Sequence, residues 1–351
     1  MSKIKVLIVD DSAYSRQTIK KILEEEANIE VVDIAYNGIE AMAKTIKLKP
    51  DLITLDIEMP EMNGFTFLRW LMKKYPTPVI IVSSHSDSQT VFKALDFGAV
   101  DFVAKPSRLS PTGINSLQKD LINKIRAIKQ LKLDRLSKTL ELDDSFNDTV
   151  SEEYTDQIIK AVGIGASTGG PAALKQIITQ LPFDYPCVVV SQHMPRGFTS
   201  SFAERLNTIS KVYVKEAEEE DELENGRVLI CPGGYHMSFK KKGKKVFVSL
   251  SEAKMSDKYI PSIDTMMSSL AETFGQKAVG VILTGMGSDG KQGMMEIKRR
   301  GGYTIVESEE TAVVFGMPNE VIKAGAAKII LPLSDIPIEM IKLAKRSMED
   351  K

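Results

Sequence analysis

Short apolar runs alternate with helical patterns along most of this 351-residue chain, and this alternation limits the folds that it can adopt. Toward the N-terminus, five such runs are rich in β-branched residues and are bounded by turn signals, which is typical of strands buried on both faces. Strands that alternate with helices form a parallel sheet with helices on both faces. We therefore predict a doubly wound (βα)5 domain with strands at residues 4–9, 31–35, 52–55, 79–82 and 100–103.

An acidic stretch divides the chain. Residues 141–156, ELDDSFNDTVSEEYTD, contain seven acids and no base. Such a stretch cannot bury enough apolar surface to offset the entropy lost on ordering it. We interpret residues 135–157 as an acidic flexible linker, with a solvated helix face as the alternative. The predicted domains are then residues 1–134 and residues 158–351.

The second block again alternates strands and helices, so we predict a second, Rossmann-like α/β domain with a mostly parallel sheet. Residues 227–250 interrupt the alternation, because two strands are joined there by GGYHMSFKKKGKK. This segment predicts an antiparallel hairpin insertion at the sheet edge. The predicted strands are residues 161–164, 187–191, 212–215, 227–230, 246–250, 279–283 and 303–306.

Composition argues against several classes of function. The net charge is −1 and no basic stripe occurs, so a nucleic-acid partner is not expected. Two cysteines, Cys187 and Cys231, cannot build a disulfide framework. The N-terminus lacks a signal-peptide pattern and no apolar run approaches 18 residues. We expect a cytoplasmic protein without membrane insertion.

Polar residues follow four predicted strands of the first block. Asp10 and Asp11 end the first strand, Asp56 the third, Ser83 the fourth and Lys105 the fifth. Ligands of open α/β sheets bind at the carboxyl ends of the strands. Converging carboxylates favour a hard cation such as Mg²⁺, and the lysine adds positive charge suited to a phosphoryl group. One aspartate could accept that group, although a single strand-end aspartate is also a common turn former.

The stretches VLIVDDS, DLITLDIEMPEMNGF, VIIVSS and GAVDFVAKP resemble the response-regulator receiver domain across about residues 3–125. The resemblance implies that a histidine kinase phosphorylates Asp56. It implies that Mg²⁺ is held by Asp10, Asp11 and Asp56 together with the carbonyl of Glu58. The implied switch residues are Ser83, Phe102 and Lys105.

A glycine-rich turn, GIGASTGGP at residues 163–171, lies between a predicted strand and a predicted helix. Such a turn can cradle a phosphate or expose a nucleophile. Nucleotide binding fits poorly, because the next strand ends without an acid for the ribose, and Pro171 replaces the lysine of a Walker loop. Gly165 to Gly169 match G-x-S-x-G, which predicts Ser167 as a nucleophile beside helix N–H groups that favour an oxyanion.

A serine nucleophile needs a base, and the chain has three histidines. His193 ends the strand expected beside the serine strand, and Asp289 lies in TGMGSDG after another strand, where it could orient the imidazole or cap the next helix. We predict a Ser167–His193–Asp289 triad. His85 lies in the first block, and His236 is a second candidate base, although a loop histidine is the simpler interpretation.

The stretches GIGASTGGP, QHMPRGFTSSFAERL, CPGGYHM, VILTGMGSDGKQGM and SEETAVVFGMPNEVIKAG resemble the catalytic domain of chemotaxis protein-glutamate methylesterases (CheB) over about residues 158–347. The resemblance implies the same triad, with Thr168 beside the nucleophile and the backbone of Met286 as an oxyanion donor. It implies hydrolysis of glutamate methyl esters on chemoreceptors, and deamidation of receptor glutamines, without a cofactor in this domain.

Other interpretations stay open at this point. The second block could be an inert docking platform, whereas a DNA-binding regulator would need a basic recognition helix that is absent. Cys231 is a weaker candidate nucleophile at an exposed strand end. Residues 240–245, with five lysines, are interpreted as a hairpin tip or as a contact for an acidic receptor surface. Unphosphorylated, the first block is expected to block access to Ser167.

Overall fold

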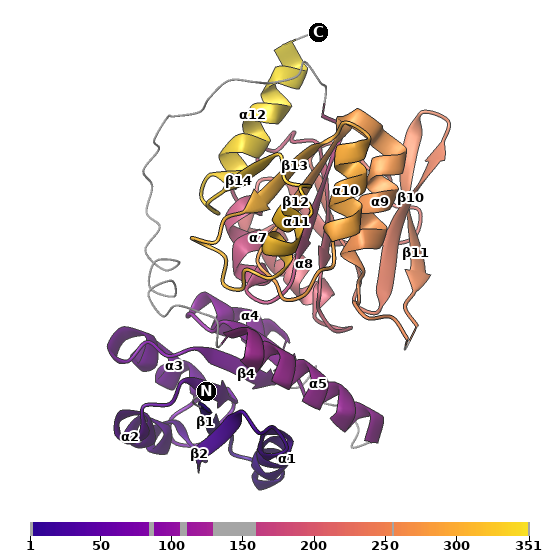
Figure 1. Cartoon of the computed structure of the whole chain (residues 1–351). Coiled ribbons are helices and arrows are strands. Elements are labelled where there is room, and N and C mark those ends of the chain that lie inside the picture. Colours follow the sequence, from indigo (N-terminus) through magenta and orange to yellow (C-terminus); the bar gives the residue numbers. More distant parts are fainter. Residues whose placement is uncertain (1–2, 84–87, 106–110, 129–158, 255, 350–351) are drawn as a thin grey trace. The chain divides into compact units, whose positions relative to one another are not determined.

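The computed structural model of this chain describes residues 3–83, 88–105, 111–128, 159–254 and 256–349. The chain divides into two compact units, Met1–Leu140 and Glu141–Lys351, and each is described by itself (Figure 1). The predicted linker at residues 135–157 lies outside the described residues, so the predicted boundaries stay a prediction.

The first unit is a five-stranded sheet in the order β2-β1-β3-β4-β5, in which every pairing is parallel. This confirms the predicted doubly wound fold. The strands are β1 Ile4–Val9, β2 Ile29–Ala35, β3 Leu52–Leu55, β4 Val79–Ser83 and β5 Asp101–Ala104. The helices are α1 Ala13–Glu24, α2 Gly38–Leu48, α3 Gly64–Lys74, α4 Ser88–Asp96 and α5 Pro111–Ile128.

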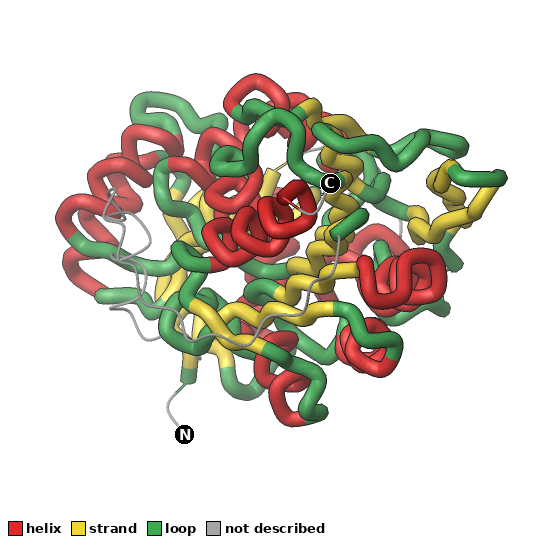
Figure 2. Tube along the Cα trace, turned by 90° about the horizontal axis from the view of Figure 1, so that it is seen from above, coloured by secondary structure: helices red, strands yellow, loops and turns green. Residues whose placement is uncertain are grey.

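The second unit is built on a seven-stranded parallel sheet in the order β14-β13-β12-β6-β7-β9-β8. Figure 2 shows its strands as a yellow layer with helices on both sides. The strands are β6 Ala161–Ala166, β7 Cys187–Gln192, β8 Tyr213–Glu216, β9 Arg227–Ile230, β12 Ala278–Ile282, β13 Tyr303–Glu307 and β14 Ile329–Leu331. The helices are α7 Gly170–Ile178, α8 Thr199–Ile209, α9 Ile263–Phe274, the 3-10 turn η2 Gly275–Lys277, α10 Lys291–Arg299, α11 Met317–Lys323 and α12 Ile336–Glu349.

The hairpin insertion is present, but its predicted partners are wrong. β9 lies inside the parallel sheet between β7 and β8. The antiparallel pair is β10 Tyr235–Lys242 with β11 Lys245–Glu252, which form a separate two-stranded sheet. It packs against α9, where the backbone N–H of Phe239 donates to Ser269 Oγ at 2.8 Å. β11 also exchanges backbone hydrogen bonds with residues 220–223, which join the two outer strands β8 and β9 at one edge of the large sheet. The strand β10 was not predicted, because its lysines obscure the alternation of buried residues at Met237 and Phe239.

Two elements at the C-terminal end of the chain were not predicted. β14 has only three residues, and its side chains are half-buried or exposed, so it lacks the apolar run of an interior strand. α12 follows β14 and is drawn in yellow in Figure 1. None of the helices among the described residues has both the length and the apolar character needed to cross a bilayer.

Glycines let the backbone and side chains approach closely around the end of β6. A Cβ at Gly165 would lie 2.4 Å from Ile263 Cγ2, so this residue admits the start of α9 against the strand. Gly169 has φ +79°, the left-handed region that glycine tolerates, and a Cβ there would lie 2.7 Å from Val313 Cβ. Glycine is therefore required at Gly169 by its backbone conformation and by the lack of room for a side chain, and at Gly165 by the lack of room alone.

We predict that Gly169→Ala destabilises the protein more than Gly243→Ala. Both glycines have positive φ, but a Cβ at Gly243 would have no atom within 4 Å, whereas a Cβ at Gly169 meets a β-branched side chain that cannot swing away. Each substitution carries a backbone cost of about 1 kcal/mol, and crowding at Gly169 adds about 1–3 kcal/mol. Urea denaturation followed by circular dichroism measures both. Equal losses would show that Val313 relaxes freely.

Candidate active site

Ser167 and His193 leave the sheet side by side. β6 and β7 are neighbouring parallel strands whose last paired residues are Ala166 and Gln192, so the next residue of each strand emerges at the same edge. The backbone N–H of His193 donates to the carbonyl of Ala166 at 3.0 Å, which holds the two chain segments together beyond the sheet. The left-handed residue of the serine turn is Gly169, and the positive-φ residues do not include Ser167.

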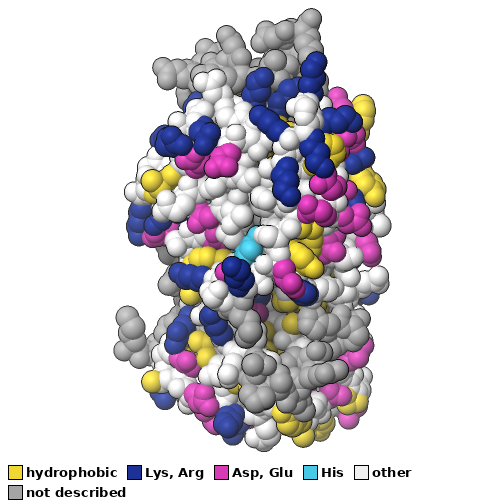
Figure 3. Space-filling model, turned by 90° about the vertical axis from the view of Figure 1, so that its right-hand side faces the viewer, with side chains coloured by type: hydrophobic (Ala, Val, Ile, Leu, Met, Phe, Trp, Pro, Cys, Tyr) yellow, Lys and Arg dark blue, Asp and Glu magenta, His cyan; other side chains and the backbone are white. Residues whose placement is uncertain are grey.

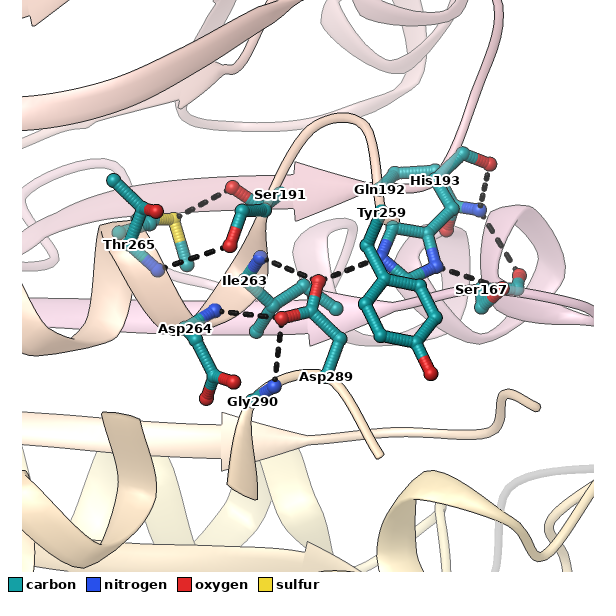
Figure 4. A network of polar contacts seen from close by, with 12 residues as sticks. Ser167, Ser191, Gln192, His193, Tyr259, Ile263, Asp264, Thr265, Asp289 and Gly290 are labelled. Carbon is teal, nitrogen blue, oxygen red and sulfur yellow. Dashed lines mark hydrogen bonds and ion pairs between the residues drawn. The ribbon is translucent and has the colours of Figure 1, made fainter. Parts of the chain in front are cut away.

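The predicted Ser, His and Asp form one hydrogen-bonded chain (Figure 4). His193 Nδ1 lies 3.1 Å from Ser167 Oγ, and Nε2 lies 2.8 Å from Asp289 Oδ2. Because a carboxylate accepts, Nε2 carries the proton, and the Nδ1 lone pair faces the serine hydroxyl. The aspartate side chain is 2% exposed and the imidazole 15%, and Ser167 is half-buried, so these hydrogen bonds start from a carboxylate in the interior.

Asp289 also caps the start of α9. Its Oδ2 accepts from the N–H of Ile263 at 2.7 Å, and its Oδ1 accepts from the N–H of Asp264 at 3.0 Å and of Gly290 at 3.1 Å. Burial by itself raises the pKa of this carboxyl, but the hydrogen bond and charge of His193, together with the two helix N–H groups, hold the pKa below its ordinary value. Asp289 is thus kept as a carboxylate, as orienting an imidazole requires.

His236 has a different role from the second candidate base that the sequence suggested. It lies in β10, and its Nε2 is 2.9 Å from Asp257 Oδ2. Its Nδ1 accepts from the backbone N–H of Ser262, the N-cap of α9, at 2.9 Å. Both ring nitrogens are engaged, so His236 fastens the chain before α9 and has no lone pair free for a substrate.

A buried network on the other side of Ser167 was missed by sequence reasoning. The carbonyl of Thr284, just after β12, accepts from the N–H of Ser167 at 3.0 Å, and the Thr284 hydroxyl donates to the carbonyl of Thr168 at 2.8 Å. The N–H of Thr284 in turn donates to Glu307 Oε2 at 2.7 Å. Glu307 is buried, and desolvation raises its pKa to about 7 although Thr284 and Thr311 donate to it. The sequence did hold one signal of this network, because Glu307 is an acid at the end of the otherwise apolar strand residues TIVE.

The two expected oxyanion donors, Thr168 and Met286, belong to the two chain segments that meet at Ser167. Thr168 follows Ser167 and is buried, whereas the side chain of Met286 is 38% exposed. Gly285 lies so near that a Cβ there would be 2.7 Å from Ser167 Cβ. Neither the N–H of Thr168 nor that of Met286 donates to another described residue. Unpaired backbone donors beside a serine are what an oxyanion hole requires.

The cysteine alternative fails. Cys187 and Cys231 are both buried, so the expectation that Cys231 is exposed is wrong. Burial raises the pKa of both thiols, which opposes formation of the nucleophilic thiolate.

The first unit carries the predicted acidic cluster. Carboxylate oxygens of Asp10, Asp11 and Asp56 lie within 4.8 Å of one another, and Lys105 Nζ contacts Asp56 and lies 2.9 Å from Asp10 Oδ2. Burial raises the pKa of Asp56, while Lys105 opposes the rise. An all-oxygen donor set fits a hard cation such as Mg²⁺. The N–H of Glu58 donates to Asp56 Oδ1 at 3.4 Å, which places its peptide at the same edge.

The expected switch residues lie nearby. The N–H of Lys105 donates to the carbonyl of Ser83 at 2.7 Å, so β4 and β5 end together. Ser83 and Phe102 are buried, and the Phe102 ring meets Phe92 edge-on at 6.1 Å between centroids. Whether they respond to a phosphoryl group stays a prediction. His85 lies outside the described residues.

The lysine cluster flanks the β10–β11 turn, as the hairpin-tip interpretation requires. Acidic side chains of the same unit pair with several of these lysines, since Lys245 lies 2.7 Å from Glu222, Lys240 lies 3.6 Å from Glu219, and Lys242 pairs with Glu220. Figure 3 shows basic and acidic side chains interspersed on this side of the molecule. The described hairpin therefore presents mixed charge rather than a uniformly basic surface.

Comparison with known families identifies both units of the chain. Residues 162–340 match the model of the CheB methylesterase family, and residues 6–111 match the response regulator receiver domain. The chain belongs to the CheB methylesterase family. It is thus an enzyme of that family with an N-terminal receiver domain, and both predicted resemblances are confirmed.

Relatives and a solved structure support this family assignment. The chain is 45% identical to protein-glutamate methylesterase/protein-glutamine glutaminase 3 of Geobacter sulfurreducens, covering 97% of this chain and 98% of the relative. It is 42% identical to enzyme 1 of the same name from Myxococcus xanthus, covering 98% of each. The crystal structure of the Thermotoga maritima CheB methylesterase catalytic domain is 45% identical and has a TM-score of 0.51, covering 53% of this chain and 98% of that one.

We predict that Glu307→Gln changes how stability depends on pH. The folded-state pKa of Glu307 is raised, so the native state binds more protons than the unfolded state between about pH 4.5 and about pH 7. As pH rises through this window, the free energy of unfolding of the wild type therefore falls by about 3 kcal/mol relative to that of the variant, and the difference is constant at higher pH. Urea denaturation from pH 4.5 to 8 measures it, with exposed Glu310→Gln as control. Parallel curves would contradict the raised pKa.

Proposed function

We propose that this chain hydrolyses methyl esters of glutamate side chains on chemoreceptors, and deamidates receptor glutamines, when its receiver domain is phosphorylated. The hydrogen-bonded Ser167–His193–Asp289 chain is the observation that carries the proposal. The names of the relatives, protein-glutamate methylesterase/protein-glutamine glutaminase, support the substrate class.

The first half of the reaction acylates Ser167. Its Oγ attacks the ester carbonyl while His193 Nδ1 takes the hydroxyl proton, since this nitrogen lies 3.1 Å away with its lone pair facing the serine. Asp289 stabilises the imidazolium through the proton on Nε2. The N–H groups of Thr168 and Met286 hold the oxyanion, each worth about 3 kcal/mol of barrier. Imidazolium then gives its proton to the departing methoxide, and methanol leaves.

The second half regenerates the enzyme. Water replaces methanol, and His193 Nδ1 removes a proton as the water oxygen attacks the acyl carbon. Collapse of the second tetrahedral species releases a free glutamate carboxylate and returns the proton to Ser167. A glutamine amide forms the analogous first tetrahedral species, from which ammonia leaves with the proton of the imidazolium, and then the same acyl-enzyme, so one site serves both reactions.

The receiver domain supplies the regulation in this proposal. Asp56 accepts a phosphoryl group from a histidine kinase in this proposal. Asp10, Asp11 and Asp56, with the carbonyl of Glu58, would hold a Mg²⁺ ion, which would supply positive charge to the phosphoryl group. Lys105, which pairs with Asp56 and Asp10, contacts the phosphoryl oxygens in this proposal. These partners assign the reaction to the cytoplasm.

We predict that Ser167→Ala abolishes methanol release from methylated receptor membranes, with a loss of at least about 10³-fold. The fold persists, because the serine side chain contributes only its Oγ contact to the network. Ser200→Ala, which removes a hydroxyl from α8, is the matched control and retains activity. Activity that survives in Ser167→Ala would refute the nucleophile and leave a docking role for this unit.

We predict that acetyl phosphate and Mg²⁺ stimulate methanol release by the wild type, in the range of about 5- to 150-fold that coupled sites commonly show. Asp56→Asn removes this response and leaves basal activity, because Asn cannot form an acyl phosphate. Asp51→Asn, an exposed aspartate that accepts from the N–H of Lys5, serves as control. Stimulation of the Asp56→Asn variant would contradict regulation through this carboxylate.

A further inference from the structure

A tyrosine ring lies flat against the histidine of the triad. The rings of His193 and Tyr259 are 3° from parallel, with centroids 5.3 Å apart, and Figure 4 shows the tyrosine covering one face of the imidazole. We propose that Tyr259 is a positioning residue, whose ring fixes the plane of His193 so that one nitrogen faces Ser167 and the other Asp289. This inference rests on the proposed function of the triad.

The imidazole needs such a support. Its two hydrogen bonds point in opposite directions, to Oγ at 3.1 Å and to Oδ2 at 2.8 Å, and together they define an axis through the ring. Rotation about that axis tilts the ring while changing these distances little. A flat aromatic neighbour opposes the tilt, because an offset parallel stack loses contact when either ring turns. Ring plane and hydrogen-bond direction are then set by separate groups.

Tyr259 is itself held from the aspartate side of the site. Its hydroxyl oxygen accepts from the N–H of Ser288, the residue before Asp289, at 3.3 Å. A Cβ at Gly287 would lie 2.5 Å from that oxygen, so this turn passes directly beneath the hydroxyl. The tyrosine therefore connects the segment bearing the base with the segment bearing its carboxylate.

The chain that carries Tyr259 is fastened on both sides. Before it, Asp257 Oδ2 accepts from the N–H of Lys254 at 2.7 Å and contacts His236. After it, the N–H of Ser262 donates to His236 Nδ1. The His236–Asp257 pair thus holds the segment that carries Tyr259, and Tyr259 supports His193. This contact explains why His236 is fixed at both ring nitrogens.

The stack also affects the charged form of the base. During acylation His193 becomes an imidazolium, and a cation over an aromatic face within about 6 Å is stabilised. The charged groups around this pair are Asp289 on Nε2 and Lys258, whose Nζ lies 4.8 Å from the centroid of the Tyr259 ring. Because Lys258 already makes a cation–π contact with this ring, the main contribution that we assign to Tyr259 is to orient His193.

Kinetics with paired variants test the proposal. Tyr259→Phe keeps the ring and removes the hydroxyl, and it retains at least about half of the wild-type kcat. Tyr259→Leu and Tyr259→Met remove the ring, and we expect kcat to fall about 10- to 100-fold, as small misplacements of reacting groups do, with KM within about twofold of wild type. Tyr235→Leu removes another half-buried tyrosine of the same unit and serves as the control. Circular dichroism confirms that each variant is folded.

A spectroscopic measurement does not depend on turnover. The full chain labelled with ¹⁵N-histidine contains only three labelled residues, and His193→Gln assigns the signal of interest. Wild type and Tyr259→Phe should show a single tautomer with the proton on Nε2, whereas Tyr259→Leu should show exchange between tautomers. If neither the wild type nor any variant releases methanol, the proposed function fails. If the tautomers still differ between proteins that keep the aromatic ring and proteins that lose it, the positioning role stands.

Three results would overturn the inference. Wild-type kcat and a single Nε2 tautomer in both Tyr259→Leu and Tyr259→Met would show that the hydrogen bonds alone hold the imidazole. A loss in Tyr259→Phe as large as in Tyr259→Leu would transfer the role from the ring to the hydroxyl and its contact with Ser288. A fall in Tyr235→Leu equal to that in Tyr259→Leu would reduce the effect to general destabilisation.

Discussion

The carboxylate of Asp289 is the group on which the second unit depends most. It accepts from the proton-bearing nitrogen of His193 and, with the same two oxygens, from the first N–H groups of α9. Helix amides and the positive end of the helix dipole stabilise a negative charge where burial would otherwise remove it. The start of α9 therefore helps His193 to keep Asp289 ionised, and the carboxylate in turn helps to anchor the start of α9.

The opposite side of Ser167 is supported by a different kind of contact. Thr284 holds the serine turn through a carbonyl and a hydroxyl, and Glu307 holds Thr284. This acid has no cation among the described residues that contact it, and burial raises its pKa to about 7. The site is thus supported by a charged carboxylate on the histidine side and by a carboxyl that burial drives toward its neutral form on the serine side.

The two units use one architectural rule for different chemistry. In each, polar groups leave neighbouring parallel strands at the carboxyl edge of the sheet. In the first unit three carboxylates and Lys105 gather there, an arrangement that suits a cation and a phosphoryl group. In the second, Ser167 follows β6 and His193 follows β7, while Asp289 comes from the turn after β12, the strand on the other side of β6.

Local patterns were sufficient for much of this description. Apolar runs, glycine turns and strand-end polar residues predicted the strands of both parallel sheets except β14, and the residues Ser167, His193 and Asp289. They failed where a residue's environment is made by distant segments. The lysine-rich β10 was concealed because its partner and α9, not its own composition, bury Met237 and Phe239. Glu307 was missed and Cys231 was misjudged for the same reason, since burial is a property of the packed chain.

Sequence by itself determined which groups could react and the order of the elements that carry them, because periodicity and turn chemistry are local. Tertiary structure decided which nitrogen of His193 faces the serine, that α9 supplies the amides around Asp289, and that Tyr259 lies flat on the imidazole. Those facts depend on atoms brought together from segments as far apart as 96 residues, and no local pattern encodes an angle or a distance between them.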